Sequence, residues 1–249
     1  MDFTCNVCSG QVSTPEATLE RETRSCPHCG STVRMRSIVH LVSMSVLGDS
    51  RPLSRFQVRK DIVGLGMSDW DGYARPLAAK FSYVNTLFHA EPFFDVAQGA
   101  GTRAGTCDFV ISTEVFEHVA PPVERAFACV FDLLKPGGKF IFTVPFTLQV
   151  ETREHFPELF DYRIVQFDDE YVLVNRTRDG RFQLHDGLVF HGGPGTTLEM
   201  RLFCQSDLRD HLVRAGFTDI CFYDTQVPEF GIYHKYPWSL PILATKPRV

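Results

Sequence analysis

The chain has 249 residues, with 30 acidic and 25 basic side chains and a formal net charge of −5. Hydrophobic residues make up 44% and charged residues 22%, which are ordinary globular values and exclude global disorder, collagen and coiled coil. No apolar run approaches the ~18 residues of a membrane span, so no membrane partner is expected. The mild acidity argues against duplex nucleic acid as a partner, because such proteins usually present a basic face.

Four of the eight cysteines fall within the first 29 residues. Cys5 and Cys8, then Cys26 and Cys29, form two pairs with two residues inside each pair, the spacing of a zinc site built from two knuckles. All four ligand positions would be filled by thiolates, so the predicted Zn²⁺ is structural and holds a small module over residues 1–33. A redox Cys-x-x-Cys pair is the alternative. The start, Met1 to Cys5, lacks the features of a signal peptide, which predicts a cytoplasmic protein.

Residues 34–56 are expected to form a helix and a linker. Ser31 or Thr32 can cap this helix, its apolar residues share one face, and Gly48 is a stop signal. Arg34 and Arg36 make the stretch locally basic. They are interpreted as a solvated face or, alternatively, as a contact for an acidic partner such as nucleic acid.

From residue 57 to the end, short apolar runs alternate with helical segments, which predicts an α/β domain with a parallel sheet covered by helices on both faces. Ser206 is the expected N-cap of the last helix and Gly216 its stop. The expected strands are Asp61–Gly64, Phe81–Leu87, Phe109–Thr113, Lys139–Val144, Thr218–Tyr223 and Leu240–Thr245. The expected helices are Tyr73–Lys80, Val123–Leu134 and Asp207–Ala215.

Gly64-Leu65-Gly66 follows the first of these strands. A glycine pair at this place lets the backbone approach a bound nucleotide, although a plain tight turn would have the same sequence. Asp69 stands where a dinucleotide fingerprint has its third glycine, which disfavours NAD and FAD.

Two further motifs point to one family. They are Cys107-Asp-Phe-Val-Ile-Ser-Thr-Glu-Val-Phe-Glu-His-Val119 and Leu134-Lys-Pro-Gly-Gly-Lys-Phe-Ile-Phe-Thr-Val-Pro145. Together they resemble the class I S-adenosylmethionine-dependent methyltransferases of the type 11 kind, over residues 57–146 and 200–247. The run from Cys26 to Arg36 is similar to a subgroup in which zinc knuckles precede this domain. The resemblance implies a Rossmann-like, seven-stranded sheet with an antiparallel last strand.

The resemblance also implies S-adenosylmethionine as cofactor and assigns residues to it. Gly64, Leu65 and Gly66 would pass beneath its methionine part. Asn85 or Thr86 would hold the ribose in place of the family's acid, which this chain lacks, and Ile62 replaces the acid of the first strand. The remaining expected contacts are Asp95 near the adenine and Thr113 and Glu114 near the reacting methyl. Glu117 and His118 are expected to be structural.

About 55 residues between the fifth strand and the last helix, roughly 147–200, exceed what the basic fold needs. They alternate in polarity around Asp179-Gly180, a strong hairpin signal, which predicts a β-hairpin lid. A glycine-rich loop follows from Phe190 to Gly195. Methyl transfer to a hydroxyl usually needs a base of near-neutral pKa, for which histidine is best suited. His155 and His191 are the favoured candidates within this insertion.

These observations predict a zinc-stabilised methyltransferase that acts on an oxygen or nitrogen of a small molecule such as a sugar or secondary metabolite. One alternative is RNA or protein methylation, which a basic surface over Arg21, Arg24, Arg34 and Arg36 would favour. Another is a catalytically silent protein with the same fold that binds a partner. The 22 phenylalanines suit either an apolar pocket or the face of a homodimer.

Overall fold

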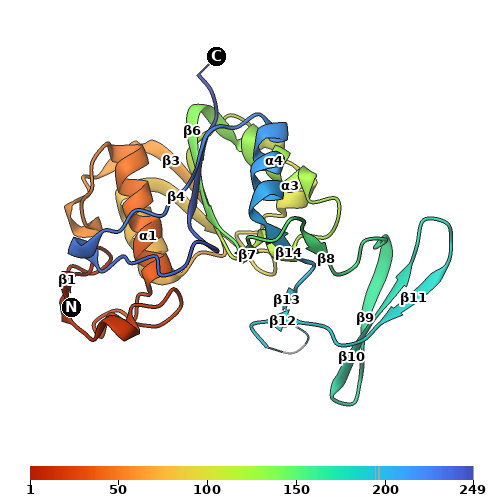
Figure 1. The fold of residues 1–249 in the computed structure, drawn as a ribbon. Helices are drawn as coiled ribbons and strands as arrows, with labels where there is room; N and C mark the ends of the chain where they lie inside the picture. Colours follow the sequence, from red (N-terminus) through yellow and green to blue (C-terminus); the bar gives the residue numbers. More distant parts are fainter. Residues whose placement is uncertain (194, 196, 249) are drawn as a thin grey trace.

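The computed structural model describes residues 1–193, 195 and 197–248. Its centre is a six-stranded sheet in which five strands run in the same direction and one antiparallel strand lies next to one edge strand (Figure 1). The strand order is β15 (Thr218–Phe222), β16 (Ile242–Thr245), β6 (Leu134–Thr143), β5 (Cys107–Thr113), β3 (Arg59–Met67) and β4 (Phe81–Thr86). The antiparallel strand is β16, the last in sequence, as the resemblance implies.

The described residues form six strands in this sheet, and the expected seven is corrected accordingly. The chain after β4 forms two short 3-10 helices, η4 (Val96–Gln98) and η5 (Gly101–Arg103), where a further strand would pair. Gly99, Gly101 and Gly105 have positive φ angles there, which an extended strand does not accommodate. β4 is therefore the edge strand.

Each face of the sheet carries its own hydrophobic core because side chains alternate along a strand. Phe109, Ile111 and Ile141 pack on one face with helices α1 (Val33–Val42) and α2 (Asp71–Lys80). Val110 and Phe140 point to the other face, towards α3 (Glu124–Leu133) and α4 (Gln205–Ala215). Figure 1 shows α1 on one side of the sheet and α3 with α4 on the other.

Local signals placed most of the helix ends correctly. Thr32 caps α1 by accepting a hydrogen bond from the Met35 N–H, and Gly216 ends α4 in the left-handed conformation at φ 101°. The N-cap of α4 is Cys204, whose sulfur accepts a hydrogen bond from the Asp207 N–H. It lies two residues before Ser206, the predicted N-cap, which was therefore wrong. After α1 the chain continues as a π-helical turn, η2 (Ser43–Leu47), which ends at Gly48.

The N-terminal module is a short hairpin of β1 (Asp2–Thr4) and β2 (Gln11–Ser13), followed by η1 (Glu16–Thr18) and a second cysteine loop. It lies beside α1 and η7 (Pro228–Phe230) (Figure 1). Phe3, Cys5 and Val12 belong to the same hydrophobic core as α1, η3 (Leu53–Arg55) and one sheet face. The module therefore shares its core with the sheet domain.

The insertion forms an arm that projects from the body of the molecule (Figure 1). It is a three-stranded antiparallel sheet of β9 (Asp161–Phe167), β10 (Glu170–Arg176) and β11 (Phe182–His185), so the expected hairpin has one strand more. Asp179-Gly180 lies in the β10–β11 turn as predicted. A small core joins the arm to the body through Phe156, Leu173, Leu198 and Met200.

Short pairings anchor the base of the arm. β14 (Arg201–Cys204) pairs with β7 (Phe146–Thr147) and β8 (Arg153–Glu154), and β12 (Phe190–His191) pairs with β13 (Thr197–Leu198). The glycine-rich loop lies between β12 and β13, and its Pro194 is outside the described residues. Within the described part of the chain, no helix is both long and apolar enough to cross a membrane.

Candidate functional site

The four N-terminal cysteines come together as the spacing predicts. Their sulfur atoms all lie within 4.8 Å of one another, with 3.7 Å between Cys5 and Cys29 and between Cys8 and Cys26. Four sulfurs placed about 2.3 Å from one tetrahedral ion would be about 3.8 Å apart. Burial acts to raise the pKa of Cys26, but hydrogen bonds from the backbone of Cys29 and His28 and from the Cys29 and Cys5 side chains together lower it to about 7. The donor set therefore fits a Zn²⁺ ion.

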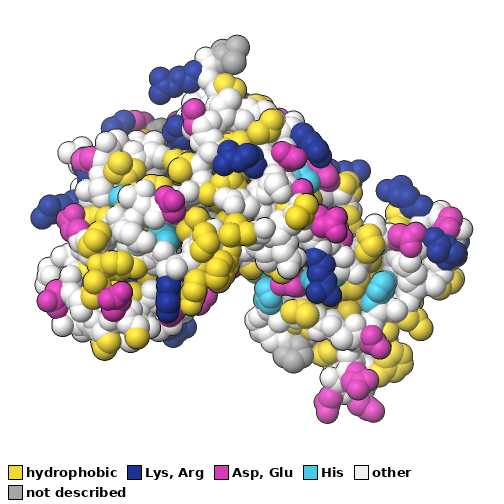
Figure 2. All heavy atoms as spheres, in the orientation of Figure 1, with side chains coloured by type: hydrophobic (Ala, Val, Ile, Leu, Met, Phe, Trp, Pro, Cys, Tyr) yellow, Lys and Arg dark blue, Asp and Glu magenta, His cyan; other side chains and the backbone are white. Residues whose placement is uncertain are grey.

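Of the arginines considered for a basic surface, Arg24 is exposed, whereas Arg34 and Arg36 are engaged within the protein. Arg36 is fully buried and donates to the carbonyls of Ser31 and Gly231, each at 2.9 Å. Arg34 makes two hydrogen bonds to Glu22, at 2.7 and 2.9 Å. On the face shown in Figure 2, Lys and Arg side chains are scattered among acidic ones.

The glycines expected in a turn after the first strand lie inside β3, which runs on to Met67. A Cβ at Gly64 would stand 2.3 Å from the Phe109 ring, and one at Gly66 would stand 2.0 Å from the Tyr83 hydroxyl. Both glycines are thus required by the close approach of aromatic side chains. Leu65, between them, is buried in the core shared with α3 and α4.

The turn after β3 holds a buried acid, Asp69. Its carboxylate accepts hydrogen bonds from the hydroxyls of Tyr73 (2.7 Å), Thr113 (3.2 Å) and Tyr83. Burial raises the pKa of Asp69 to about 6, although these three hydroxyls act in the opposite direction. Asn85 braces the same turn, since its amide accepts from the Asp69 N–H at 2.9 Å and donates to the Asp69 carbonyl at 2.8 Å.

The other side chains expected at the cofactor are placed at this edge or near it. Thr86 ends β4, is buried, and donates to the Gly66 carbonyl at 2.7 Å. Asp95 caps η4, where its carboxylate accepts from the Ala97 N–H and from the Gln98 amide. The structure thus places Thr86 and Asn85 at the carboxyl end of β4 and Thr113 at that of β5, on either side of β3. Their contact with a cofactor stays a prediction.

Glu114 follows β5 and has a left-handed backbone, with φ 56°. Its carboxylate receives two hydrogen bonds from the Arg21 guanidinium, at 2.7 and 3.1 Å, and Arg21 also donates to the Ser239 carbonyl at 2.9 Å. Burial acts to raise the pKa of the Glu114 carboxyl, but the Arg21 charge lowers it below its usual range. One arginine of the module thereby joins the carboxyl edge of the sheet to the C-terminal loop.

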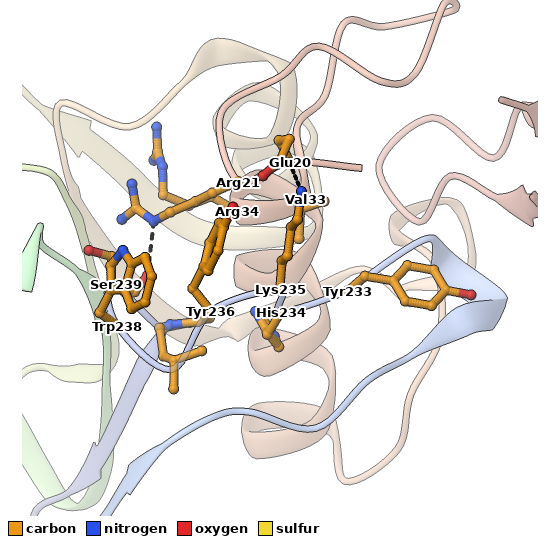
Figure 3. A pocket seen from close by; sticks show the side chains of 12 residues that line it. Glu20, Arg21, Val33, Arg34, Tyr233, His234, Lys235, Tyr236, Trp238 and Ser239 are labelled. Atoms are coloured by element: carbon orange, nitrogen blue, oxygen red, sulfur yellow. Dashed lines mark hydrogen bonds and ion pairs between the residues drawn. The ribbon is translucent and has the colours of Figure 1, made fainter. Parts of the chain in front are cut away.

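A cavity of about 240 Å³ opens beside this arginine. Figure 3 shows Arg21 and Arg34 on one side of it and the loop from Tyr233 to Ser239 on the other. Tyr236 and Trp238 stack within this loop, with ring centroids 4.4 Å apart. The wall therefore combines aromatic rings with cationic side chains.

The two histidines favoured as bases share one carboxylate. His155 Nε2 lies 2.8 Å from Glu199 Oε1, and His191 Nε2 lies 3.2 Å from Glu199 Oε2. The structure thus brings His155 and His191 together from two ends of the insertion. A carboxylate that holds an imidazole is the arrangement that orients a general base.

Glu117 and His118 lie against the same group. His118 Nε2 is 3.2 Å from His191 Nδ1, and His118 Nδ1 is 2.8 Å from the Leu198 carbonyl. Burial lowers the pKa of His118, and burial together with the Glu114 charge raises that of Glu117 well above its usual range. The expected structural role of Glu117 and His118 is an incomplete description, because both are ionisable groups inside a cluster.

Sequence reasoning missed Asp69, Arg21 and Glu199 as members of the site. In the sequence, Asp69 indicates only that the third glycine of a dinucleotide fingerprint is missing. An acid that directly follows a buried strand is also a signal for a functional site. Arg21 and Glu199 lie in irregular segments, where no periodicity shows the direction of a side chain.

Comparisons with known proteins agree with this geometry. A sequence profile described as a methyltransferase domain matches residues 49–222. No curated protein matches the chain. Among solved structures, the CurJ carbon methyltransferase superposes with a TM-score of 0.50 at 13% identity, covering 87% of this chain and 56% of that chain. A 1,6-didemethyltoxoflavin N1-methyltransferase from Burkholderia thailandensis gives a TM-score of 0.46 at 16% identity, covering 86% of this chain and 78% of that chain.

Proposed function

The chain belongs to the methyltransferase-domain family and, from that premise, we propose that it transfers a methyl group from S-adenosylmethionine to an oxygen or nitrogen of a small molecule. The observation that carries the proposal is the carboxyl edge of the sheet. Ligands bind at this edge in open α/β folds. Here it ends in a buried carboxylate, Asp69, and in Glu114, which is paired with Arg21.

The residues present at this edge fit the cofactor in their chemistry. S-adenosylmethionine supplies an electrophilic methyl group on a cationic sulfur. We assign its binding to Gly64, Leu65, Gly66, Asn85, Thr86, Asp95, Thr113 and Glu114. Asp69 joins them, because a buried carboxylate with a raised pKa favours a nearby cation or hydroxyl donor.

A small acceptor is supported by the size and lining of the cavity beside Arg21. Its 240 Å³ is slightly below the roughly 300–1,000 Å³ of typical small-molecule sites, and its stacked Tyr236 and Trp238 offer a surface for a flat or apolar group. Toxoflavin and amino pentose methyltransferases are among the proteins of similar fold. The chain's part in the reaction would be to align the acceptor with the methyl and to exclude water.

We assign the general base to His155 or His191, the pair held by Glu199. The test is the pH dependence of kcat/KM in His155→Gln and His191→Gln, each against the unaltered protein. Removal of the base should lower the rate 10²–10⁴-fold and abolish the acid limb of the profile. If a variant loses rate but keeps the acid limb, the histidine that was replaced is not the general base.

A second function, binding without catalysis, has one observation in its favour. The two side chains expected at the ribose are already hydrogen-bonded within the protein: Asn85 to the Asp69 backbone and Thr86 to the Gly66 carbonyl. RNA methylation is disfavoured, since three of the four arginines of the expected basic surface, Arg21, Arg34 and Arg36, are paired or buried, and Arg24 is the exposed one.

Calorimetric titration of the zinc-loaded protein with S-adenosylhomocysteine separates these functions. The enzyme should bind it in the micromolar range. Thr113→Val removes a hydroxyl at the carboxyl end of β5 and should weaken binding about 5–10-fold, the effect of one hydrogen bond. Thr245→Val makes the same change in a buried threonine at the opposite edge of the sheet and should leave binding unchanged. No binding at millimolar ligand would refute the enzymatic function.

A further inference from the structure

Glu117 is the most unusual polar side chain of the arm's base. It lies in the short helix η6 (Phe116–His118), its side chain has no exposed surface, and neither carboxylate oxygen has a hydrogen-bond partner among the described residues. His118 Nε2 lies 3.7 Å from Glu117 Oε1, which is too far for a hydrogen bond. A buried carboxylate without hydrogen bonds is strongly disfavoured unless a cation or a proton neutralises it.

The hydrogen bonds of the two neighbouring histidines define which nitrogens face Glu117. A carbonyl only accepts, so His118 must donate from Nδ1 to the Leu198 carbonyl, which leaves a lone pair on Nε2 in the neutral ring. His191 Nε2 lies 3.2 Å from the Glu199 carboxylate, and in a neutral ring that donates to this carboxylate the lone pair is on Nδ1. The lone pair of His191 Nδ1 then faces that of His118 Nε2.

Two nitrogen lone pairs 3.2 Å apart repel each other unless a positive charge lies between them. The 3.2 Å between the two nitrogens also matches the distance between two ligands of one metal ion. Two nitrogens about 2.1 Å from one ion, at an angle of roughly 100°, are about 3.2 Å apart. One oxygen of Glu117 and one ring nitrogen each of His118 and His191 all lie within 4.8 Å of one another.

We propose that Glu117, His118 and His191 bind a divalent first-row transition-metal cation, at a second metal site separate from the four cysteines. Two imidazoles and a carboxylate are a donor set for Zn²⁺, Mn²⁺, Fe²⁺ or Co²⁺. The outer nitrogens bond to the Leu198 carbonyl and the Glu199 carboxylate, the kind of support that orients metal-bound histidines. Three protein ligands leave coordination positions open for water or another oxygen. With His191 as a ligand, His155 is the histidine left for the general base.

Mn²⁺ binding tests the site without any assay of methyl transfer. Mn²⁺ prefers nitrogen and oxygen ligands over thiolates, so it leaves the cysteine site to zinc. The full chain is loaded with one equivalent of Zn²⁺, which the four thiolates take first, and is then titrated with Mn²⁺ while the free ion is followed by electron paramagnetic resonance. We expect about one Mn²⁺ per chain, with affinity at least 10-fold lower in Glu117→Gln and His191→Gln.

His89→Gln is the matched control, because His89 is an exposed histidine far from this cluster in sequence. Its Mn²⁺ affinity should equal that of the unaltered chain. Zinc content and circular dichroism establish that each variant is folded. His191 lies in a partly exposed loop, so its variant remains informative even if the buried Glu117→Gln fails to fold. Absent Mn²⁺ binding, or binding that is equal in His191→Gln and the unaltered chain, would overturn the proposal.

Discussion

Replacing Asp69 with asparagine should stabilise the protein at neutral pH. The carboxylate is fully buried, and its pKa of about 6, against an ordinary 3.8, already includes the hydrogen bonds from Tyr73, Tyr83 and Thr113. A rise of about two units means that ionisation of this group costs the folded state about 3 kcal/mol. Asparagine keeps the shape of the side chain and can still accept and donate hydrogen bonds, but it carries no charge.

Proton linkage determines how this difference in the free energy of unfolding changes with pH. Because the folded pKa is higher than the unfolded one, the destabilisation is absent below about pH 4, grows between about pH 4 and 6, and is complete above pH 6. The unfolding free energy of Asp69→Asn should therefore exceed that of the unaltered protein by about 3 kcal/mol at pH 8. At pH 5 the difference should be about half as large.

Urea unfolding of the zinc-saturated proteins at several pH values between 5 and 8 measures this difference. Loss of zinc at the lower pH affects both proteins and cancels in the comparison. Asp71→Asn is the control, since Asp71 is an exposed acid two residues away and its replacement should change stability by less than about 0.5 kcal/mol. A difference that does not vary with pH would refute the claim that burial of the Asp69 charge sets its pKa. Weaker binding of S-adenosylhomocysteine by the stabilised variant would explain why the chain keeps the acid.

Three further predictions concern the module and the helix ends. Chelation of zinc should lower the Tm of the whole chain in a single transition, because the module shares its core with α1 and the sheet; an unchanged Tm by circular dichroism would contradict this. Arg21→Met should reduce stability by about 1 kcal/mol at pH 7, and the loss should vanish as the pH falls through the depressed pKa of Glu114; urea melts at pH 7 and pH 3.5 decide it. Gly216→Ala should cost about 1 kcal/mol or more, since φ is 101° and the new Cβ would meet the Phe131 ring at 3.0 Å; a neutral effect in the same melts would show that the α4 end can relax.

The sequence by itself determined the elements and the identity of the family. Alternating apolar runs, glycine stops and paired cysteines are local signals, because they depend on backbone geometry within one strand, one turn or one knuckle. The clustering of the four cysteines, the α4 stop at Gly216 and the antiparallel last strand were therefore predicted correctly, whereas the bound zinc stays a prediction. The expected seventh strand was wrong for a local reason as well, since its segment is occupied by glycines in left-handed conformations.

Only the tertiary structure decided the electrostatics of the site. Arg21 is 93 residues from Glu114 in sequence, and His118 is 73 residues from His191, yet each pair is in contact. A raised or lowered pKa depends on burial and on neighbours that come from other elements, neither of which a linear pattern contains. For this reason the sequence identified which residues could carry chemistry, whereas the fold determined which of them meet and which charges are left buried.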